Sequence, residues 1–413
     1  SLRLHAIAPA IRSHCRRSAR RAAAADTSAT VTTAAPTEAG LVLGVGAEGS
    51  WDSLAVGAPS VRCFFGDDEQ RWFMWYSGRA GGPHAAELAH GCVGLATSTD
   101  GVEWERGSGQ VATLAGGGGV RADSEVGASI LPNADDWWTF DTCHVGAPDV
   151  QILSSGSVKS AGGVYWCFYT GGDFEDLAEV KGTTFGGEGA RTRIGLALSQ
   201  DGRNWARVEG PHHTGAMLDC GEEGAWDARG IAAPSIVLTG PREYRMYYHA
   251  EPSEEGAGAA IGVAVSKDGL SWERKSVAKP VLGASSIAGS ADELGVAHPN
   301  VFRVAKNAWV MFYEGRGADG RRSVCVADST DGYAWERQQN AVFEPSTDAG
   351  AWDAGAVGSP NLVPMAEGKF RLYYAGASGA GAAPTGIGLA LGSGPIDGKG
   401  EWTFRRRGET AQA

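Results

Sequence analysis

One repeated pattern limits the folds open to this chain more than any other feature. The string STDGVEWER begins at Ser98, and close copies of it begin at Ser199, Ser266 and Ser329. An aromatic run such as VYWCFYTGGD precedes each copy, and an apolar run with a central proline precedes each aromatic run. These two runs occur five times, and the prolines are Pro59, Pro148, Pro234, Pro299 and Pro360. The chain must therefore stack five similar small units.

Each unit is predicted to consist of four short antiparallel strands. The Pro-centred run, the aromatic run and an Ile/Val-Gly run have strand composition, and a Trp-containing strand follows the DG turn. In the last unit the third run continues as IGLALGSGPIDGKGEW, with a longer turn. Units of this kind bury their faces by stacking radially, which predicts an all-β, five-bladed β-propeller. The prolines are 89, 86, 65 and 61 residues apart, so the period of roughly 40 to 45 residues of WD40 propellers does not fit.

The first 40 residues differ from the rest of the chain. They hold six arginines against two acidic residues and continue into a run rich in Ala, Ser and Thr. This composition indicates an organelle transit peptide at 1–40, for a chloroplast rather than a mitochondrion, with a disordered leader as the alternative. The propeller is expected at 41–407 and a tail at 408–413, with blades at about 45–115, 135–215, 225–285, 290–345 and 350–407.

Composition argues against several classes of function. The net charge is −12 although the leader is basic, so a nucleic-acid partner is not expected. The seven cysteines are scattered without a CxxC pair or a metal-ligand spacing, which indicates buried thiols in a reducing compartment and no structural zinc. The sequence contains no P-loop and no nucleophile elbow, and no apolar stretch reaches the roughly 18 to 20 residues of a membrane span. We therefore expect a soluble protein without a cofactor.

The S-x-D-G-x-x-W string predicts a hairpin turn between the third and fourth strands of a unit. Its Asp would accept hydrogen bonds from turn amides, its Gly would take a positive φ, and its Trp would pack between blades. The string resembles the Asp box of sialidases and related propellers. We assign these carboxylates to structure rather than to catalysis, because turns spread around a rim do not converge.

Candidate functional residues gather on the opposite face of the predicted propeller, which we call the mouth. Because the strands of a blade alternate in direction, the first strand begins, the second ends and the third begins on this face. The candidates are Arg79, Asp141, His144, Asp149, Asp173, Glu251, His298, Asn300, Glu314, Arg316 and Asn361. Three histidines on this face, His144, His249 and His298, could hold a metal, but ordinary hydrogen-bonded histidines are the preferred interpretation, and no metal is predicted.

The blade count, the inner-strand prolines, the aromatic second strands and the DG turns together resemble the five-bladed propeller glycoside hydrolases, the arabinanase/levansucrase/invertase superfamily with its family 43 and 32 types. The likeness spans residues 45–407. It implies an Asp in blade one, an Asp in blade two and a Glu in blade three, because one carboxylate protonates the leaving oxygen while another supplies or activates the nucleophile. This chain departs from the pattern, with Ala58 in blade one, Ala233 and Ser235 around the blade-three proline, and Asp149 after its proline.

Two hypotheses follow from these residues. In the first, the mouth binds a carbohydrate or a glycosylated small molecule, with or without hydrolysis or transfer. Its catalytic carboxylates would be Asp149, Glu251 and Glu314. Its substrate-binding residues would be Arg79, Asp141, His144, Asp173, His298, Asn300, Arg316 and Asn361, with Trp137 and Trp138 available to stack on sugar faces.

In the second hypothesis the propeller is a non-catalytic scaffold for a protein partner in an organelle, because the acids of blades one and three are missing. The two hypotheses predict different axes. Two carboxylates within roughly 5 to 10 Å of each other across the axis would favour the first. A filled or apolar axis with an exposed apolar patch on the rim would favour the second.

Overall fold

The computed structural model describes residues 38–65, 70–80, 91–106, 112–113, 119–121, 128–133, 136–153, 163–173, 191–250, 258–395 and 400–409. Within these ranges the chain is all-β, as predicted, apart from a single-turn 3-10 helix at Ala366–Gly368. Most of the predicted leader and most of the predicted tail lie outside the described residues. In the part of the chain that is described, no helix is long and apolar enough to cross a membrane.

Five units of four antiparallel strands follow one another along the described chain, and the strands of each unit pair in sequence order. Unit one contains β2 (Ala55–Phe65), β3 (Gln70–Arg79), β4 (Cys92–Ser98) and β5 (Glu105–Arg106). Unit two contains β9 (His144–Leu153), β10 (Val164–Gly172), β11 (Thr192–Ser199) and β12 (Trp205–Val208). Unit three contains β13 (Ile231–Gly240), β14 (Glu243–Ala250), β15 (Ala260–Ser266) and β16 (Glu273–Arg274). Unit four contains β17 (Gly295–Ala305), β18 (Ala308–Arg316), β19 (Arg322–Ser329) and β20 (Glu336–Arg337). Unit five contains β21 (Ala356–Pro364), β22 (Lys369–Ala377), β23 (Gly386–Ser393) and β24 (Thr403–Arg406).

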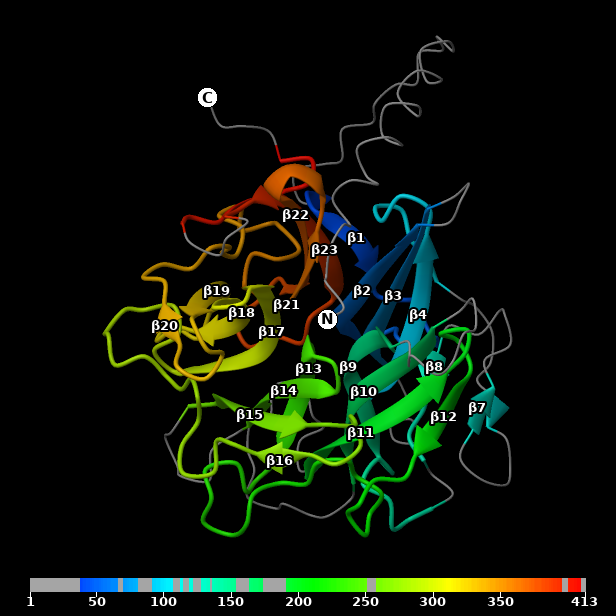
Figure 1. Ribbon diagram of the computed structural model, residues 1–413. Coiled ribbons are helices and arrows are strands. Elements are labelled where there is room, and N and C mark those ends of the chain that lie inside the picture. Colours follow the sequence, from blue (N-terminus) through cyan, green and yellow to red (C-terminus); the bar gives the residue numbers. More distant parts are fainter. Residues whose placement is uncertain are drawn as a thin grey trace.

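The inner strands of the five units surround a common centre (Figure 1). Strand β2 contacts β9, β9 contacts β13, β13 contacts β17, β17 contacts β21, and β21 returns to β2. The other strands of each unit lie progressively farther from this centre. The sheets are therefore arranged as in a β-propeller.

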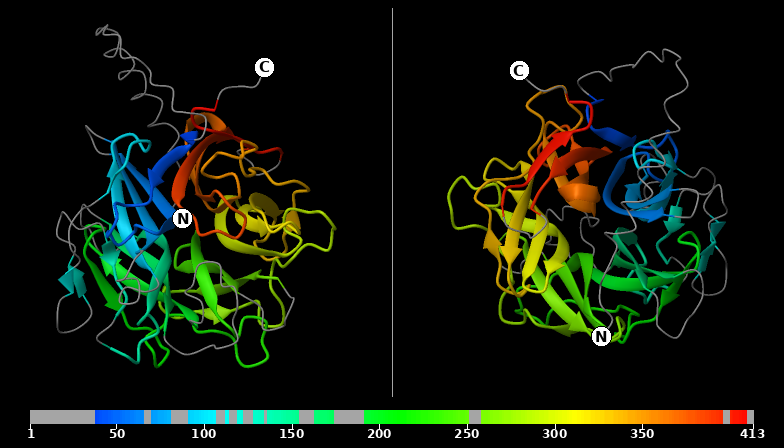
Figure 2. Two further views of the ribbon diagram at one scale, coloured as in Figure 1. Left: turned by 180° about the vertical axis from the view of Figure 1, so that it is seen from behind. Right: turned by 45° about the horizontal axis from the view of Figure 1, so that its top comes forward.

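Main-chain hydrogen bonds join the two ends of this ring. Strand β1 (Leu41–Gly44) pairs with β23 of the last unit, and the amide of Gly40 donates to the carbonyl of Arg407. Figure 2 shows β1, in blue, beside the orange and red strands of unit five. Three further short strands add to the outer edges of the sheets: β6 (Ala112–Thr113), β7 (Gly119–Arg121) and β8 (Ala128–Ile130).

The hydrophobic core lies between neighbouring units. Among the described residues, five clusters of buried side chains each join two adjacent units. The second strand of a unit contributes to the clusters on both of its sides: Trp75 packs with unit two, whereas Tyr76 packs with unit five, and both are fully buried. Burial on both faces explains why the second strands are almost continuously apolar instead of alternating.

The DG turns have the predicted geometry. In unit four, Asp331 Oδ1 accepts hydrogen bonds from the amides of Tyr333 (2.7 Å) and Ala334 (2.9 Å), and Gly332 has a φ of +73°. Trp335 packs edge-on against Tyr247 of unit three, with ring centroids 5.8 Å apart. The same Asp contacts and inter-unit Trp contacts recur in the three other S-x-D-G turns. The repeated string therefore shapes the turn and joins neighbouring units.

Candidate functional site

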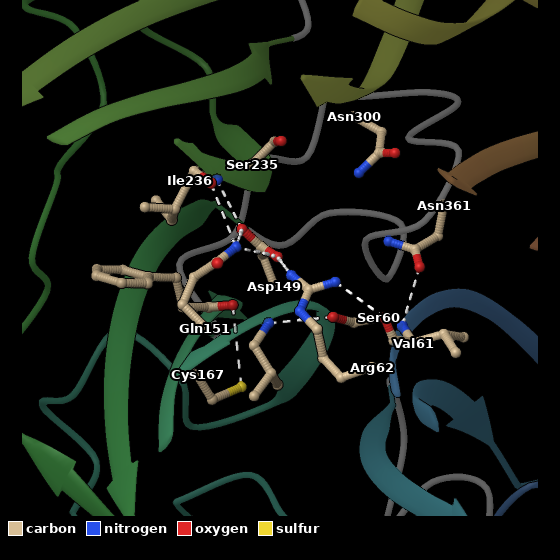
Figure 3. Close-up of polar contacts among 12 residues, drawn as sticks. Ser60, Val61, Arg62, Asp149, Gln151, Cys167, Ser235, Ile236, Asn300 and Asn361 are labelled. Atoms are coloured by element: carbon tan, nitrogen blue, oxygen red, sulfur yellow. Dashed lines mark hydrogen bonds and ion pairs between the residues drawn. The ribbon is translucent and has the colours of Figure 1, made fainter. Parts of the chain in front are cut away.

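A ring of side-chain acceptors joins the five inner strands near the axis (Figure 3). In each strand, the residue after the proline accepts a hydrogen bond from a main-chain N–H of the next unit. The five bonds run from Val61 N to Asn361 Oδ1 (2.9 Å), Val150 N to Ser60 Oγ (3.1 Å), Ile236 N to Asp149 Oδ2 (2.6 Å), Val301 N to Ser235 Oγ (3.1 Å) and Leu362 N to Asn300 Oδ1 (2.9 Å). We call Ser60, Asp149, Ser235, Asn300 and Asn361 the acceptor ring.

The acceptor ring accounts for the residue types that follow the prolines. Ser, Asp and Asn all present an oxygen acceptor on a short side chain, and a buried N–H without an acceptor is costly. Asn300 and Asn361, which the sequence predicts to bind substrate, each use Oδ1 in this ring and also line the axial cavity. Their roles toward a substrate remain a prediction.

Asp149 is the single carboxylate of the acceptor ring. It is 7% exposed and accepts hydrogen bonds from three groups: the amide of Ile236, the Nη2 of Arg62 at 3.0 Å and the Nε2 of Gln151 at 2.9 Å (Figure 3). Burial raises the pKa of Asp149, although Arg62 and the amide of Ile236 oppose the shift. At the other four positions of the acceptor ring, neutral side chains accept the equivalent hydrogen bond.

A small cavity lies on the axis beside the acceptor ring. Its volume is about 40 Å³. Every unit contributes its proline and the residue before it, and units two to five also contribute the residue after it. A water molecule needs roughly 10 to 15 Å³ measured in this way, so the cavity can hold a few waters but not a sugar ring. Ala58, Ala147 and Ala233 form an apolar cluster on one side of it.

The residues before the prolines share an unusual backbone. Ala58, Ala147, Ala233, His298 and Ser359 have φ values of 45°, 43°, 48°, 48° and 46°, and the pairing with the second strand shifts register at each. A left-handed conformation in a residue other than glycine is strained and persists where surrounding contacts hold it. Its presence in all five units indicates a requirement of the ring rather than of one site.

A second series of side chains lies one step toward the mouth, at equivalent positions near the ends of the second strands. Four of them accept a hydrogen bond from the N–H of a pre-proline residue in the next unit: Ser77 from Ala147 (2.7 Å), Thr170 from Ala233 (2.9 Å), His249 from His298 (3.2 Å) and Glu314 from Ser359 (3.1 Å). Unit five has Ala375 at this position, which offers no side-chain acceptor. Units three and four thus place ionisable groups where units one and two use hydroxyls.

These ionisable groups form a buried polar sector that spans units three to five. The rings of His249 and His298 have centroids 4.9 Å apart, and burial lowers the pKa of each to about 3. Both are therefore neutral near pH 7, and His249 must carry its proton on Nε2 because Nδ1 accepts a hydrogen bond. Glu314 is 3% exposed, and the guanidinium of Arg322 lies 3.7 Å from its carboxylate. We call His249, His298, Glu314, Arg322 and Ser359 the mouth cluster.

A separate ion-pair network lies in unit two. Arg193, which is buried, binds Asp173 at 2.5 Å and Asp219 at 2.7 Å, and His212 lies 3.2 Å from Asp219. The structure therefore gives Asp173, a predicted substrate-binding residue, an arginine partner at the start of β11. Asp219 and Arg193 were not among the predicted residues. Asp219 stands beside no repeated motif, whereas Arg193 directly precedes the Ile/Val-Gly run of unit two, and that position could have revealed it.

Asp141, another predicted site residue, belongs to a fivefold set of buried carboxylates. One such Asp precedes each inner strand and binds a second-strand Tyr hydroxyl and a fourth-strand Arg: Asp52 with Tyr76 and Arg106, Asp141 with Tyr169 and Arg207, Asp227 with Tyr248 and Arg274, Asp292 with Tyr313 and Arg337, and Asp353 with Tyr374 and Arg406. These contacts account for Asp141 without a substrate. An Arg recurs after the Trp of every unit, and that signal could have revealed the set.

The remaining candidates are dispersed around the mouth. Arg79 and Arg316 end β3 and β18 and are half-buried, His144 begins β9 and is buried, and Glu251 lies outside the described residues. Trp137 and Trp138 are 87% and 43% exposed in the segment before β9. Within the described ranges, no group of three or more His, Cys, Asp or Glu side chains is arranged to hold a metal ion.

Sequence comparisons connect this chain to proteins whose own roles are not described. No family model matches it. The uncharacterized protein Rv1502 of Mycobacterium tuberculosis (strain ATCC 25618 / H37Rv) is 28% identical over 288 residues, covering 66% of this chain and 82% of that protein. The uncharacterized protein MT1551 of Mycobacterium tuberculosis (strain CDC 1551 / Oshkosh) is 27% identical over the same shares.

Several solved structures with a similar backbone are glycoside hydrolases. A putative glycoside hydrolase from Parabacteroides distasonis ATCC 8503 matches with a TM-score of 0.54 and 16% identity, over 89% of this chain and 95% of that one. A thermostable family-43 glycoside hydrolase matches with a TM-score of 0.56 and 13% identity, over 90% and 98%. The chain has the fold of the propeller glycoside hydrolases. A structure from the GH130 family of mannoside phosphorylases agrees, with a TM-score of 0.53 and 16% identity over 84% and 88%. The likeness expected from the repeats is thereby confirmed for the fold.

Proposed function

We propose that the five units are the blades of one five-bladed propeller and that its mouth binds a carbohydrate or a glycosylated small molecule. The observation that carries this proposal is the mouth cluster. Buried ionisable side chains without a structural counterpart in the other units gather at functional sites more often than elsewhere. The glycoside hydrolase fold of the neighbours supports a carbohydrate as the ligand.

In the hydrolytic form of the proposal, two carboxylates have different surroundings and hence different roles. Burial raises the pKa of Asp149, which favours the protonated form that a leaving-group oxygen needs. Glu314, whose carboxylate lies 3.7 Å from the guanidinium of Arg322, takes the second role, in which it activates a water molecule or attacks the sugar. Glu251, Arg79, Arg316, His298 and Asn300 remain candidates for the same mouth, as acid or as groups that orient hydroxyls.

A second candidate function, binding without hydrolysis, has observations of its own. The alanine cluster at Ala58, Ala147 and Ala233 leaves one side of the axis apolar, and the Asp149 carboxylate already holds the amide of Ile236 and Arg62. Trp137, 87% exposed, would provide an aromatic surface on the rim for a partner. In this form the protein is a binding or assembly scaffold, and the basic leader would direct it to a chloroplast.

Titration calorimetry and hydrolysis assays on the same panel of oligosaccharides and aryl glycosides separate these functions. The variants are Glu314→Gln and Asp149→Asn, and Glu336→Gln in the exposed part of β20 is the matched control. For a glycosidase, we expect turnover in the wild type and the control and a loss of about 100-fold or more in Glu314→Gln. Binding that Glu314→Gln weakens, without turnover, would establish the second function. If the panel neither binds nor is cleaved, a carbohydrate role for the mouth is refuted.

A further inference from the structure

A larger cavity lies on the face opposite the mouth, between units three and four. Its volume is about 550 Å³, and it is lined by the β13–β14 hairpin, the DG turn of unit three and Tyr333 in the DG turn of unit four. Cavities that bind small molecules usually measure roughly 300 to 1,000 Å³. We call it the turn-face cavity. Neither the mouth cluster nor the acceptor ring contributes to it.

One wall of the turn-face cavity is an aromatic ring held in place by a stacked arginine. The guanidinium of Arg245 lies between two rings, 4.2 Å from the centroid of Tyr333 and 4.5 Å from that of Trp309. Its Nη1 also donates to the carbonyl of Asp331, at 2.5 Å. Tyr333 nevertheless remains 37% exposed. A fixed aromatic ring with an open edge and surface can contact a ligand with little loss of side-chain entropy.

The aromatic wall is peculiar to this junction among the four S-x-D-G turns. The residue after the Gly is Val102 in unit one, Arg203 in unit two and Leu270 in unit three. Arg371 of unit five makes the same contact as Arg245, to the carbonyl of Asp100, but the residue after the Gly of that turn is Val102 instead of an aromatic residue. The Arg contact is thus a repeated structural feature, whereas Tyr333 is not required by the repeat.

The charges around the cavity nearly cancel. Arg245 and Lys267 are cationic, and Glu243, Asp268 and Glu273 are anionic. Asp268 is engaged by the amides of its own turn, and Glu273 binds Lys275 at 2.5 Å. The rim therefore offers hydrogen-bond donors and acceptors together without a strong field of either sign, which disfavours both a phosphate-like anion and an organic cation.

We propose that the turn-face cavity binds an uncharged polyhydroxylated ligand, a short oligosaccharide, independently of the mouth. The apolar C–H face of a sugar ring suits the surface of Tyr333. Its hydroxyls suit the mixed carboxylate, ammonium and hydroxyl groups of Glu243, Lys267 and Ser271, which also line the cavity.

Titration calorimetry with maltotriose, cellotriose, mannotriose and xylotriose tests this inference on the full chain. Tyr333→Ala removes the wall, and Ser271→Trp fills the cavity from an exposed position. Leu270→Ala, at the equivalent turn residue of unit three and outside the cavity lining, is the matched control. We expect at least one trisaccharide to bind the wild type and Leu270→Ala equally, and both cavity variants to weaken that binding at least tenfold.

Glu314→Gln tests the mouth proposal separately. This variant should leave the affinity of the turn-face cavity for the trisaccharide unchanged. Binding that persists in both Tyr333→Ala and Ser271→Trp, or no binding by any of the four trisaccharides, would overturn the assignment. Binding abolished by Glu314→Gln alone would place the ligand in the mouth and would likewise overturn it. Both proposals would be supported if the wild type binds two trisaccharides per chain, if Tyr333→Ala and Ser271→Trp each remove one of them, and if Glu314→Gln removes the other.

Discussion

Replacing Asn361 by alanine tests whether the acceptor ring stabilises the closed propeller. Oδ1 of Asn361 accepts the amide of Val61 at 2.9 Å, across the junction between the last unit and the first. Asn361 is 4% exposed and Val61 is 1% exposed, so bulk solvent does not reach the amide of Val61, and the axial cavity that Asn361 lines holds only a few waters. A buried N–H left without a partner costs about 1 to 3 kcal/mol, and we expect Asn361→Ala to lower the free energy of unfolding by this amount.

Asn361→Ser is the matched variant, because serine performs the same role at two other junctions. Ser60 Oγ and Ser235 Oγ accept the equivalent amides at 3.1 Å. The serine variant loses nearly as much side-chain volume as the alanine variant but keeps an acceptor, so it should recover about half or more of the loss. Unfolding in guanidinium chloride, followed by tryptophan fluorescence, gives both differences from the transition midpoints at an unchanged slope. Equal destabilisation by Ala and Ser would refute the hydrogen-bond argument and assign the effect to packing.

Three further predictions address the repeated contacts and the buried histidines. Arg406→Leu should cost about 3 to 5 kcal/mol, because it leaves the Asp353 carboxylate buried without its cation; a loss below about 1 kcal/mol in the same denaturation assay would contradict this. Gly332→Ala should cost about 1 to 2 kcal/mol, because alanine must adopt a φ near +73°, and a melting temperature equal to that of the wild type would count against it. The pKa of His249 is about 3 in the native protein, lowered mainly by burial, against roughly 6.5 when unfolded. Since the unfolded chain binds the extra proton between these values, stability should fall as the pH falls from 6.5 toward 3. His249→Asn, which keeps an acceptor for the amide of His298, should reduce this slope by about 1.4 kcal/mol per pH unit, and an unchanged slope would show that His249 is not buried in its neutral form.

The repeats predicted the strands and turns well because the relevant interactions are local. Hairpin turns, turn-capping Asp residues and glycines with positive φ depend on neighbours within a few positions, and Asp331 and Gly332 show the expected geometry. The spacing of five similar units predicted an all-β fold with the sheets of a propeller, because small antiparallel units bury both faces only against one another. Even the inter-unit packing of Trp335 followed from the repeat.

The partners of the candidate site residues depended on the tertiary structure. Asp149 and Asn361 were selected as carboxylate and amide near the axis, yet the groups that they contact lie 87 and 300 residues away in the sequence. No local pattern identifies which N–H will donate a hydrogen bond to a given Ser, Asp or Asn, because the donor belongs to a neighbouring unit that approaches only when the ring closes. The pairing of β1 with β23, the burial of Glu314 beside Arg322 and the cavity at Tyr333 likewise arise only when distant units pack together. The sequence alone therefore predicted the strands and turns, whereas the burial and the partners of each ionisable group were determined by the tertiary structure.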